Sequence, residues 1–129
     1  MSLQTEPDLR IVLFGIPLQT AESLEHILSG WGAILYIPPQ FPIFRGLGLI
    51  RDAAPDMIFA WAGGDSSTSL IEVVRAAEPN IPIVAVNAHM KSSEILDALD
   101  DGAVDYCTPP FDRSHLQGLL QAADKTACC

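Results

Sequence analysis

Five short, almost continuously apolar segments recur along the chain at regular intervals. In order they are residues 10–14 (RIVLF), 33–37 (AILYI), 57–61 (MIFAW), 83–86 (IVAV) and 104–107 (VDYC). Strands that are covered on both faces have such sequences, because neither of their faces has to be polar. The pattern therefore predicts five buried strands of a parallel sheet.

The intervals between these segments carry apolar residues at helical spacing, three and four positions apart. The sets that define four predicted helices are Leu24, Ile27 and Leu28; Leu70, Val73, Val74 and Ala77; Ile95, Leu96 and Leu99; and Leu116, Leu119 and Leu120. The expected N-caps are Thr20, Ser69 in a capping box with Glu72, Ser92 or Ser93, and Asp112, and the expected ends are Gly30, Pro79 and Gly102. Residues 41–50 are rich in glycine and proline, which predicts a short or distorted helix there.

The order of strand and helix, repeated five times, defines the expected architecture. Parallel neighbours need right-handed crossovers, so the helices cover both faces of the sheet. The simplest arrangement is a single doubly wound α/β domain with a five-stranded parallel sheet of order 2-1-3-4-5. Its core is expected over about residues 9–123, with flexible ends. An end just after the last predicted helix fits a stand-alone protein or a piece of a longer regulator.

Composition narrows the possible partners and compartments. The chain of 129 residues is 49% hydrophobic and has seven Lys and Arg against sixteen Asp and Glu, a net charge of −9. That charge, with scattered basic residues, argues against binding nucleic acid or an anionic membrane. Three cysteines with no CxxC pair predict neither a disulfide framework nor structural zinc, which suits the reducing cytoplasm. The chain shows no signal peptide and no apolar run of the roughly 18 residues that a membrane span needs.

Ligands of such folds bind where the strands end, so the loops there carry the candidate chemistry. Gly15, Ile16 and Pro17 follow the first strand, and none of them is an acid or a base. Asp65 and the Gly63-Gly64 pair follow the third strand, and turn chemistry explains both. His89 follows the fourth strand without a nucleophile at triad spacing. The sequence therefore predicts no enzyme, no cofactor and no metal site.

Four segments resemble a known family, and their order and spacing match it over about residues 9–123. They are residues 10–14, the Pro-Asp-apolar entry at 55–59, residues 81–86 and, most specifically, Gly-Ala-Val-Asp-Tyr-Cys-Thr-Pro-Pro-Phe at 102–111. The chain resembles the receiver domain of bacterial response regulators, the CheY-like family. The resemblance implies the same fold, with a cis peptide bond between Pro109 and Pro110.

The chain departs from this family at each position of the phosphorylation site. The acidic pair that holds Mg²⁺ in active receivers falls on Gly15 and Ile16, and the phosphorylatable aspartate falls on Trp61. The Ser or Thr that ends the fourth strand is Asn87, and the lysine is Pro109. These residue types cannot hold Mg²⁺, accept a phosphoryl group or neutralise it.

The resemblance therefore implies a degenerate receiver, a pseudo-receiver that acts in a two-component-type regulator without phosphorylation. We expect a signalling or regulatory protein–protein contact, with a partner or as a homodimer, through the fourth helix, fifth strand and fifth helix. Candidate contact residues are Asp97, Asp101, the switch aromatic Tyr106, Arg113 and Gln117.

A small-molecule sensor is the alternative interpretation. Its ligand would occupy the space between Gly15, Trp61, Asn87 and Pro109 that the missing acids leave. An ordered cavity there favours the sensor, whereas a Trp61 side chain packed into that space speaks against it.

Overall fold

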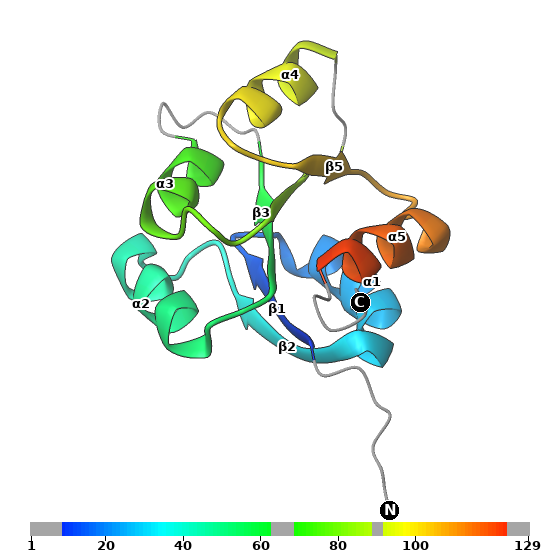
Figure 1. The fold of residues 1–129 in the computed structure, drawn as a ribbon, viewed down its shortest axis with the longest axis horizontal. Helices are drawn as coiled ribbons and strands as arrows, with labels where there is room; N and C mark the ends of the chain where they lie inside the picture. Colours follow the sequence, from blue (N-terminus) through cyan, green and yellow to red (C-terminus); the bar gives the residue numbers. More distant parts are fainter. Residues whose placement is uncertain (1–8, 63–68, 89–91, 124–129) are drawn as a thin grey trace, which may run out of the picture.

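A computed structural model describes residues 9–62, 69–88 and 92–123 of the chain (Figure 1). In chain order its elements are β1 (Leu9–Phe14), α1 (Leu18–Leu28), the 3-10 helix η1 (Ser29–Trp31), β2 (Gly32–Ile37), α2 (Ile43–Ala53), β3 (Met57–Trp61), α3 (Leu70–Ala77), β4 (Ile83–Val86), α4 (Ser92–Asp100), β5 (Asp105–Cys107) and α5 (Arg113–Ala123). All five predicted strands form, within one residue of their predicted bounds. The expected flexible ends lie outside the described residues.

The five strands form one parallel sheet of order β2-β1-β3-β4-β5, so the predicted fold class and topology are confirmed. The register places Ile11 between Ile34 on one side and Met57 on the other. Strand β5 is an edge strand, with Tyr106 opposite Ala85 of β4. The carboxyl ends of all five strands therefore share one edge of the sheet, where the candidate loops begin.

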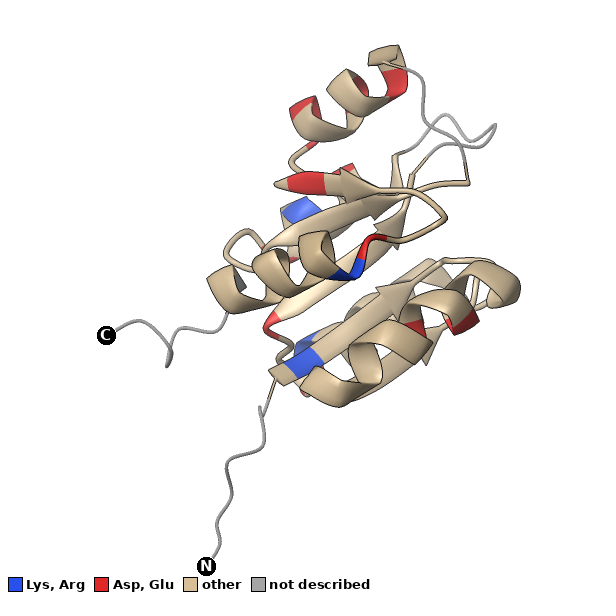
Figure 2. Cartoon of the chain, turned by 90° about the vertical axis from the view of Figure 1, so that its right-hand side faces the viewer, with Lys and Arg blue, Asp and Glu red and all other residues tan. Residues whose placement is uncertain are grey.

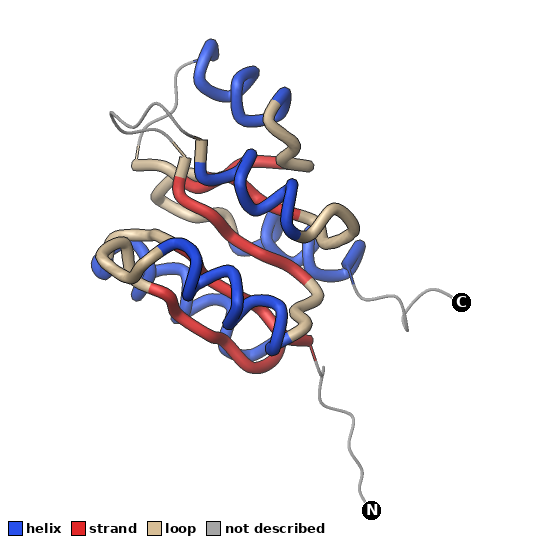
Figure 3. The backbone as a smooth tube through the Cα atoms, turned by 90° about the vertical axis from the view of Figure 1, so that its left-hand side faces the viewer, coloured by secondary structure: helices blue, strands red, loops and turns tan. Residues whose placement is uncertain are grey.

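Helices cover both faces of this sheet (Figure 1, Figure 3). Ile11 and Leu13 of β1 belong to the core beneath α1 and α5, whereas Val12 and Phe14 belong to the core beneath α2, α3 and α4. All four side chains are almost completely buried. Because both faces are covered, successive residues can all be apolar, which explains the continuous apolar segments of the sequence.

Two of the four expected helix caps are confirmed, and the other two, at Thr20 and at Ser92 or Ser93, are wrong. The Ser69 hydroxyl accepts a hydrogen bond from the Glu72 N–H at 3.3 Å, and the Asp112 carboxylate accepts one from the Ser114 N–H at 2.9 Å. Helix α1 begins at Leu18, so Thr20 lies inside it and its N-cap is Pro17. Proline suits this helix start because it has no N–H to leave without a partner.

Helix α2 corrects a second expectation, since it runs for eleven residues where a short or distorted helix was predicted. Pro42 stands at its N-cap, outside the helical hydrogen bonds that proline would break. Gly46 faces the sheet, where an added Cβ would lie 2.6 Å from a ring carbon of Phe14. The glycine therefore brings this helix close to β1 instead of disrupting it.

Helix α4 is the least embedded helix. Ala98 is its only buried residue among those described, and Ile95 is half-buried. Leu96 and Leu99 are 63% and 39% exposed, so the apolar spacing that marked this helix does not describe a face turned to the core. Ser92 and Ser93 lie within the helix rather than capping it from outside. Helix α4 therefore presents apolar side chains to solvent.

Candidate functional site

The loop after β1 begins at Gly15 and is packed against an apolar side chain of α3. Gly15 has a left-handed backbone, φ 71°, and its N–H donates to the Ile37 carbonyl at 2.8 Å. A Cβ added at Gly15 would lie 2.7 Å from Cδ2 of Leu70, the first residue of α3. The space into which a side chain at Gly15 would project is therefore occupied by a leucine.

The next residue, Ile16, is completely buried in the core beneath α1 and α5. Its carbonyl accepts a hydrogen bond from the Tyr36 hydroxyl at 2.6 Å, which ties the loop to β2. Burial, and then the negative charge of Glu22, raise the pKa of Tyr36 above its ordinary value. The neutral hydroxyl that makes this bond is thus stabilised.

Trp61 ends β3, next to this loop. An added Cβ at Gly15 would lie 3.9 Å from the Trp61 Cβ, so the two positions are neighbours. The indole is half-buried and packs against the core that contains Ile16. Position 61 thus contributes packing to the core beneath α1 and α5.

The loops after β4 and β5 complete this edge of the sheet. The Asn87 side-chain amide donates to the Ala62 carbonyl, and the Asn87 N–H donates to the Cys107 carbonyl at 3.4 Å. Asn87 thus links the ends of β3 and β5 to its own strand. The peptide bond between Pro109 and Pro110 is cis, as expected, and Pro109 is exposed.

The structure brings Gly15, Trp61 and Asn87 to one edge of the sheet, and Pro109 follows β5 at the same edge. The described residues of the four loops (15–17, 61–62, 87–88 and 108–110) include no acid, lysine or arginine. Across the described ranges of the chain, no three His, Cys, Asp or Glu residues lie close enough together to hold a metal ion. Asp65, Gly63, Gly64 and His89 lie outside the described residues.

The edge strand β5 carries an interaction that the sequence analysis missed. His115 Nε2 of α5 lies 3.0 Å from Asp105 Oδ2, and Asp105 Oδ1 accepts the Tyr106 N–H at 2.7 Å. Tyr106 packs, half-buried, against the core beneath α2, α3 and α4. A separation of ten residues carries no periodic signal, so the contact of Asp105 with His115 could not be read from the pattern.

Cys107 is a core residue of β5, as expected, with 5% of its surface exposed. Burial, and then the charge of Asp105, raise the pKa of its thiol to about 12. The thiolate is the reactive form of cysteine. Cys107 is thus a packing residue rather than a nucleophile at neutral pH.

The expected contact face is formed by α4, β5 and α5. Asp97, Arg113 and Gln117 are exposed, and Asp101 and Tyr106 are partly exposed. Figure 2 shows that the charged positions of α4 are acidic. Four of the five residues thus lie on α4, β5 or α5, and Asp101 directly follows α4; their role in binding stays a prediction.

The comparisons with known sequences point to transcription regulators. No family model matches the chain. It is 25% identical over 122 residues to the transcriptional regulatory protein ZraR of Escherichia coli, a match that covers 92% of this chain and 27% of ZraR. It is 32% identical over 75 residues to the transcriptional regulatory protein KdpE of Staphylococcus aureus, covering 57% of this chain and 32% of KdpE. The chain thus spans about a quarter to a third of the length of these relatives.

Solved structures share the fold at low sequence identity. A CheY-like protein, tadZ, of Pseudomonas aeruginosa superposes with a TM-score of 0.77 at 22% identity, covering 90% of this chain and 99% of that one. A putative pilus assembly-related protein of Burkholderia pseudomallei gives 0.75 at 15% identity, covering 100% and 98%.

The chain thus has the CheY-like α/β fold with strand order β2-β1-β3-β4-β5, and its sequence is similar to parts of transcriptional regulatory proteins. The described part of the chain contains no helix long and apolar enough to cross a membrane.

Proposed function

We propose that this receiver domain works without phosphorylation, as a protein–protein interaction module of a two-component-type regulator. The observation that carries the proposal is Trp61, which ends β3 and packs against the core where the resemblance places the phosphorylatable aspartate. Indole offers no oxygen to which a phosphoryl group could be transferred.

The neighbouring positions support the same conclusion. Mg²⁺ in proteins is usually bound through one or two carboxylates, and the positions aligned with the acidic pair are Gly15 and the buried Ile16. No cation follows at Pro109 to neutralise an acyl phosphate. Phosphorylation would thus need several replacements at once, whereas binding through an outer face needs none of these groups.

The contact face in this proposal is α4–β5–α5, with Asp97, Asp101, Tyr106, Arg113 and Gln117 as its polar rim. Its occupant is a partner protein or a second copy of the chain. The relatives named as transcriptional regulatory proteins support a regulatory role, although the chain spans only part of them. A cytoplasmic location, and the absence of direct contact with nucleic acid or membrane, remain predictions.

The small-molecule sensor has less support. Its ligand would need the space beside Gly15 and Trp61, where Leu70 approaches the glycine and the indole packs against the core. These contacts leave the interaction module as the function that the geometry favours.

Incubation with acetyl phosphate and Mg²⁺, followed by intact-mass measurement, tests the proposal. The expected result is no phosphoryl adduct on the full chain. The matched variant is Asp65→Asn, because Asp65 is the acid nearest in sequence to Trp61 on its carboxyl side. An adduct on the wild-type chain that disappears in the variant would overturn the proposal and assign Asp65 as the acceptor.

A further inference from the structure

Two helices on the same face of the sheet expose apolar side chains beside charges of opposite sign. The first surface, the α2 patch, consists of Ile43, Phe44, Arg45, Gly48, Leu49 and Arg51; Asp52 is also exposed on this helix, so α2 carries a net charge of +1. Phe44 is 88% exposed, and Ile43 and Leu49 are 45% and 39% exposed. An exposed phenylalanine at this fraction has almost no contact with its own fold, so the fold itself does not require it.

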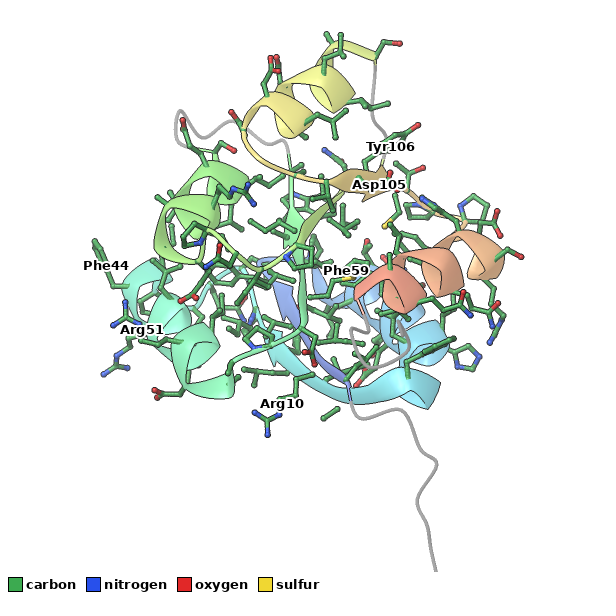
Figure 4. The ribbon with its side chains drawn as sticks, in the orientation of Figure 1. Arg10, Phe44, Arg51, Phe59, Asp105 and Tyr106 are labelled. Carbon is green, nitrogen blue, oxygen red and sulfur yellow. The ribbon has the colours of Figure 1, made fainter. Side chains whose placement is uncertain are left out.

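The α2 patch is ordered along one flank of the helix. Phe44, Gly48 and Arg51 recur at i, i+4 and i+7, which places them on the same side. Figure 4 shows that Phe44 and Arg51 both project away from the body of the domain. Gly48 lies between them, and a Cβ added there would meet no atom within 4 Å. The flank thus carries an aromatic ring and a guanidinium on either side of a glycine with open space around it.

The second surface, the α4 patch, consists of Leu96, Asp97, Leu99 and Asp100. Leu96 is 63% and Leu99 39% exposed, and both aspartates are exposed beside them. Helix α4 contains no lysine or arginine (Figure 2). An apolar pair flanked by acids has the composition that the α2 patch would bind.

The charged groups of both patches have no ion-pair partner in the part of the chain that the structure describes. Among the described residues, neither Arg45 nor Arg51 makes an ion pair, and neither do Asp97 and Asp100. Both patches also lie in one helical layer, with α3 between them (Figure 1). One chain therefore carries two complementary surfaces, the α2 patch and the α4 patch, which do not contact each other within that chain.

We propose that the α2 patch of one copy docks on the α4 patch of a second copy, so that the domains associate head to tail. Phe44 then meets Leu96 and Leu99, and the two arginines meet the two aspartates. The symmetric alternatives are disfavoured, because α2 against α2 faces arginine with arginine and α4 against α4 faces aspartate with aspartate. Arginine suits such a contact, since its planar group donates in pairs to carboxylates.

This geometry has a consequence for the assembly. In a head-to-tail contact each copy keeps one free patch, so association continues into a ring or an open chain instead of stopping at a two-fold dimer. The inference rests on the proposed function, because it uses the α4 end of the proposed contact face. It adds α2 as the second half of the interface.

Complementary charge-reversal variants of the full chain test the proposal by sedimentation velocity. Variant A is Arg45→Glu/Arg51→Glu and keeps its α4 patch. Variant B is Asp97→Lys/Asp100→Lys and keeps its α2 patch. We expect the wild type to form species larger than dimers as its concentration rises. Each variant alone should self-associate with an affinity at least about tenfold lower. Mixing A with B should restore assemblies larger than dimers in which A and B alternate, because the native patch of each variant meets the native patch of the other and the two reversed patches are also complementary.

A fourth protein carries all four reversals and should recover self-association, since the charges are exchanged rather than removed. Circular dichroism and thermal unfolding confirm that each variant is folded. A wild type that stays monomeric, or a mixture of A and B without a complex, would overturn the inference. If A associates like the wild type and only B fails, the α4 face binds without α2; the inference is then wrong and the proposed function stands.

Discussion

Apolar side chains are buried or packed at the edge of the sheet where β1 and β3 end. On the outer surfaces of α2 and α4 they are exposed. At the sheet edge, Ile16 is completely buried and Trp61 packs against the core. On the helices, Phe44 is 88% and Leu96 is 63% exposed, with charged residues beside them. Among the described residues, the edge that binds ligands in folds of this type is therefore lined by packed apolar side chains, whereas the exposed apolar side chains lie on the helices.

The two regions differ in the chemical groups that they offer to a binding partner. The loops of the sheet edge offer backbone hydrogen bonds and apolar contacts, which hold the fold together. The α2 and α4 patches combine apolar area with unpaired charge, which is what specific protein contacts use.

The largest expected effect comes from replacing Trp61 by aspartate. The variant loses the packing of a half-buried indole and sets a carboxylate against an apolar core, so the free energy of unfolding should fall by about 3 kcal/mol. Urea unfolding measures the loss, and Trp61→Phe, which keeps an aromatic ring, should lose much less. A stable Trp61→Asp variant that also binds Mg²⁺ would contradict this account, because a single replacement would then restore the metal site of a receiver.

The second effect concerns Cys107, at the β5 end of the same edge. Its pKa is about 12 in the folded chain against an ordinary 9.0, so between these values the folded thiol keeps a proton that the unfolded thiol has lost. The stability that this provides is complete below pH 9 and is lost as the pH rises towards 12. At pH 10.5 the loss should reach about 2 kcal/mol, at roughly 1.4 kcal/mol per pKa unit.

The control is Cys107→Ala, because Tyr36 also has a raised pKa and contributes in the same direction. Urea unfolding at pH 8 and pH 10.5 should show a smaller alkaline loss in the variant than in the wild type. Equal losses in both proteins would mean that Cys107 titrates normally and that this end of the edge is open to water.

The third effect compares two glycines. Gly15 has a positive φ and Leu70 beside it, so Gly15→Ala should cost about 1 to 2 kcal/mol of the free energy of unfolding. Gly30 has no atom within 4 Å of an added Cβ, so Gly30→Ala should change stability by no more than about 0.5 kcal/mol. Equal effects in thermal unfolding would contradict the close packing at the end of β1.

The smallest expected effect concerns the exposed surface of α2. Gly48 is exposed inside α2, so Gly48→Ala should raise the free energy of unfolding by about 1 kcal/mol through helix propensity. The added methyl group fills the open space beside Phe44, so association should weaken as stability rises. Gly30→Ala is the matched control, because Gly30 is also exposed with open space around it and lies outside α2, α4, β5 and α5, so this variant should not weaken association.

The fold could be predicted almost completely from the sequence, because buried parallel strands and short loops leave strong local signals. The five strands, the cap at Ser69 and the cis bond before Pro110 were all expected and all found. The regular α2 was not expected, because the sequence alone cannot show that Gly46 faces Phe14.

The sequence predicts which residue types stand at the candidate site, but it does not predict how their side chains pack. The residue types at Gly15, Ile16 and Trp61 already exclude a carboxylate site at those positions. The approach of Leu70 to Gly15, and the exposure of Leu96 on α4, depend on how distant elements meet. The contact between Asp105 and His115 depends on the same tertiary arrangement, which no periodicity encodes.

Titration with Mg²⁺ and beryllofluoride tests the central claim, phosphorylation independence, most directly. The Trp31→Phe variant leaves Trp61 as the only tryptophan of the chain, so its fluorescence reports on the sheet edge itself. Sedimentation of the same samples reports on association. We expect neither signal to change in a saturable way with the two ions present. A saturable change in Trp61 fluorescence that requires both Mg²⁺ and beryllofluoride would contradict the account, because an acid would then have taken over as the acceptor.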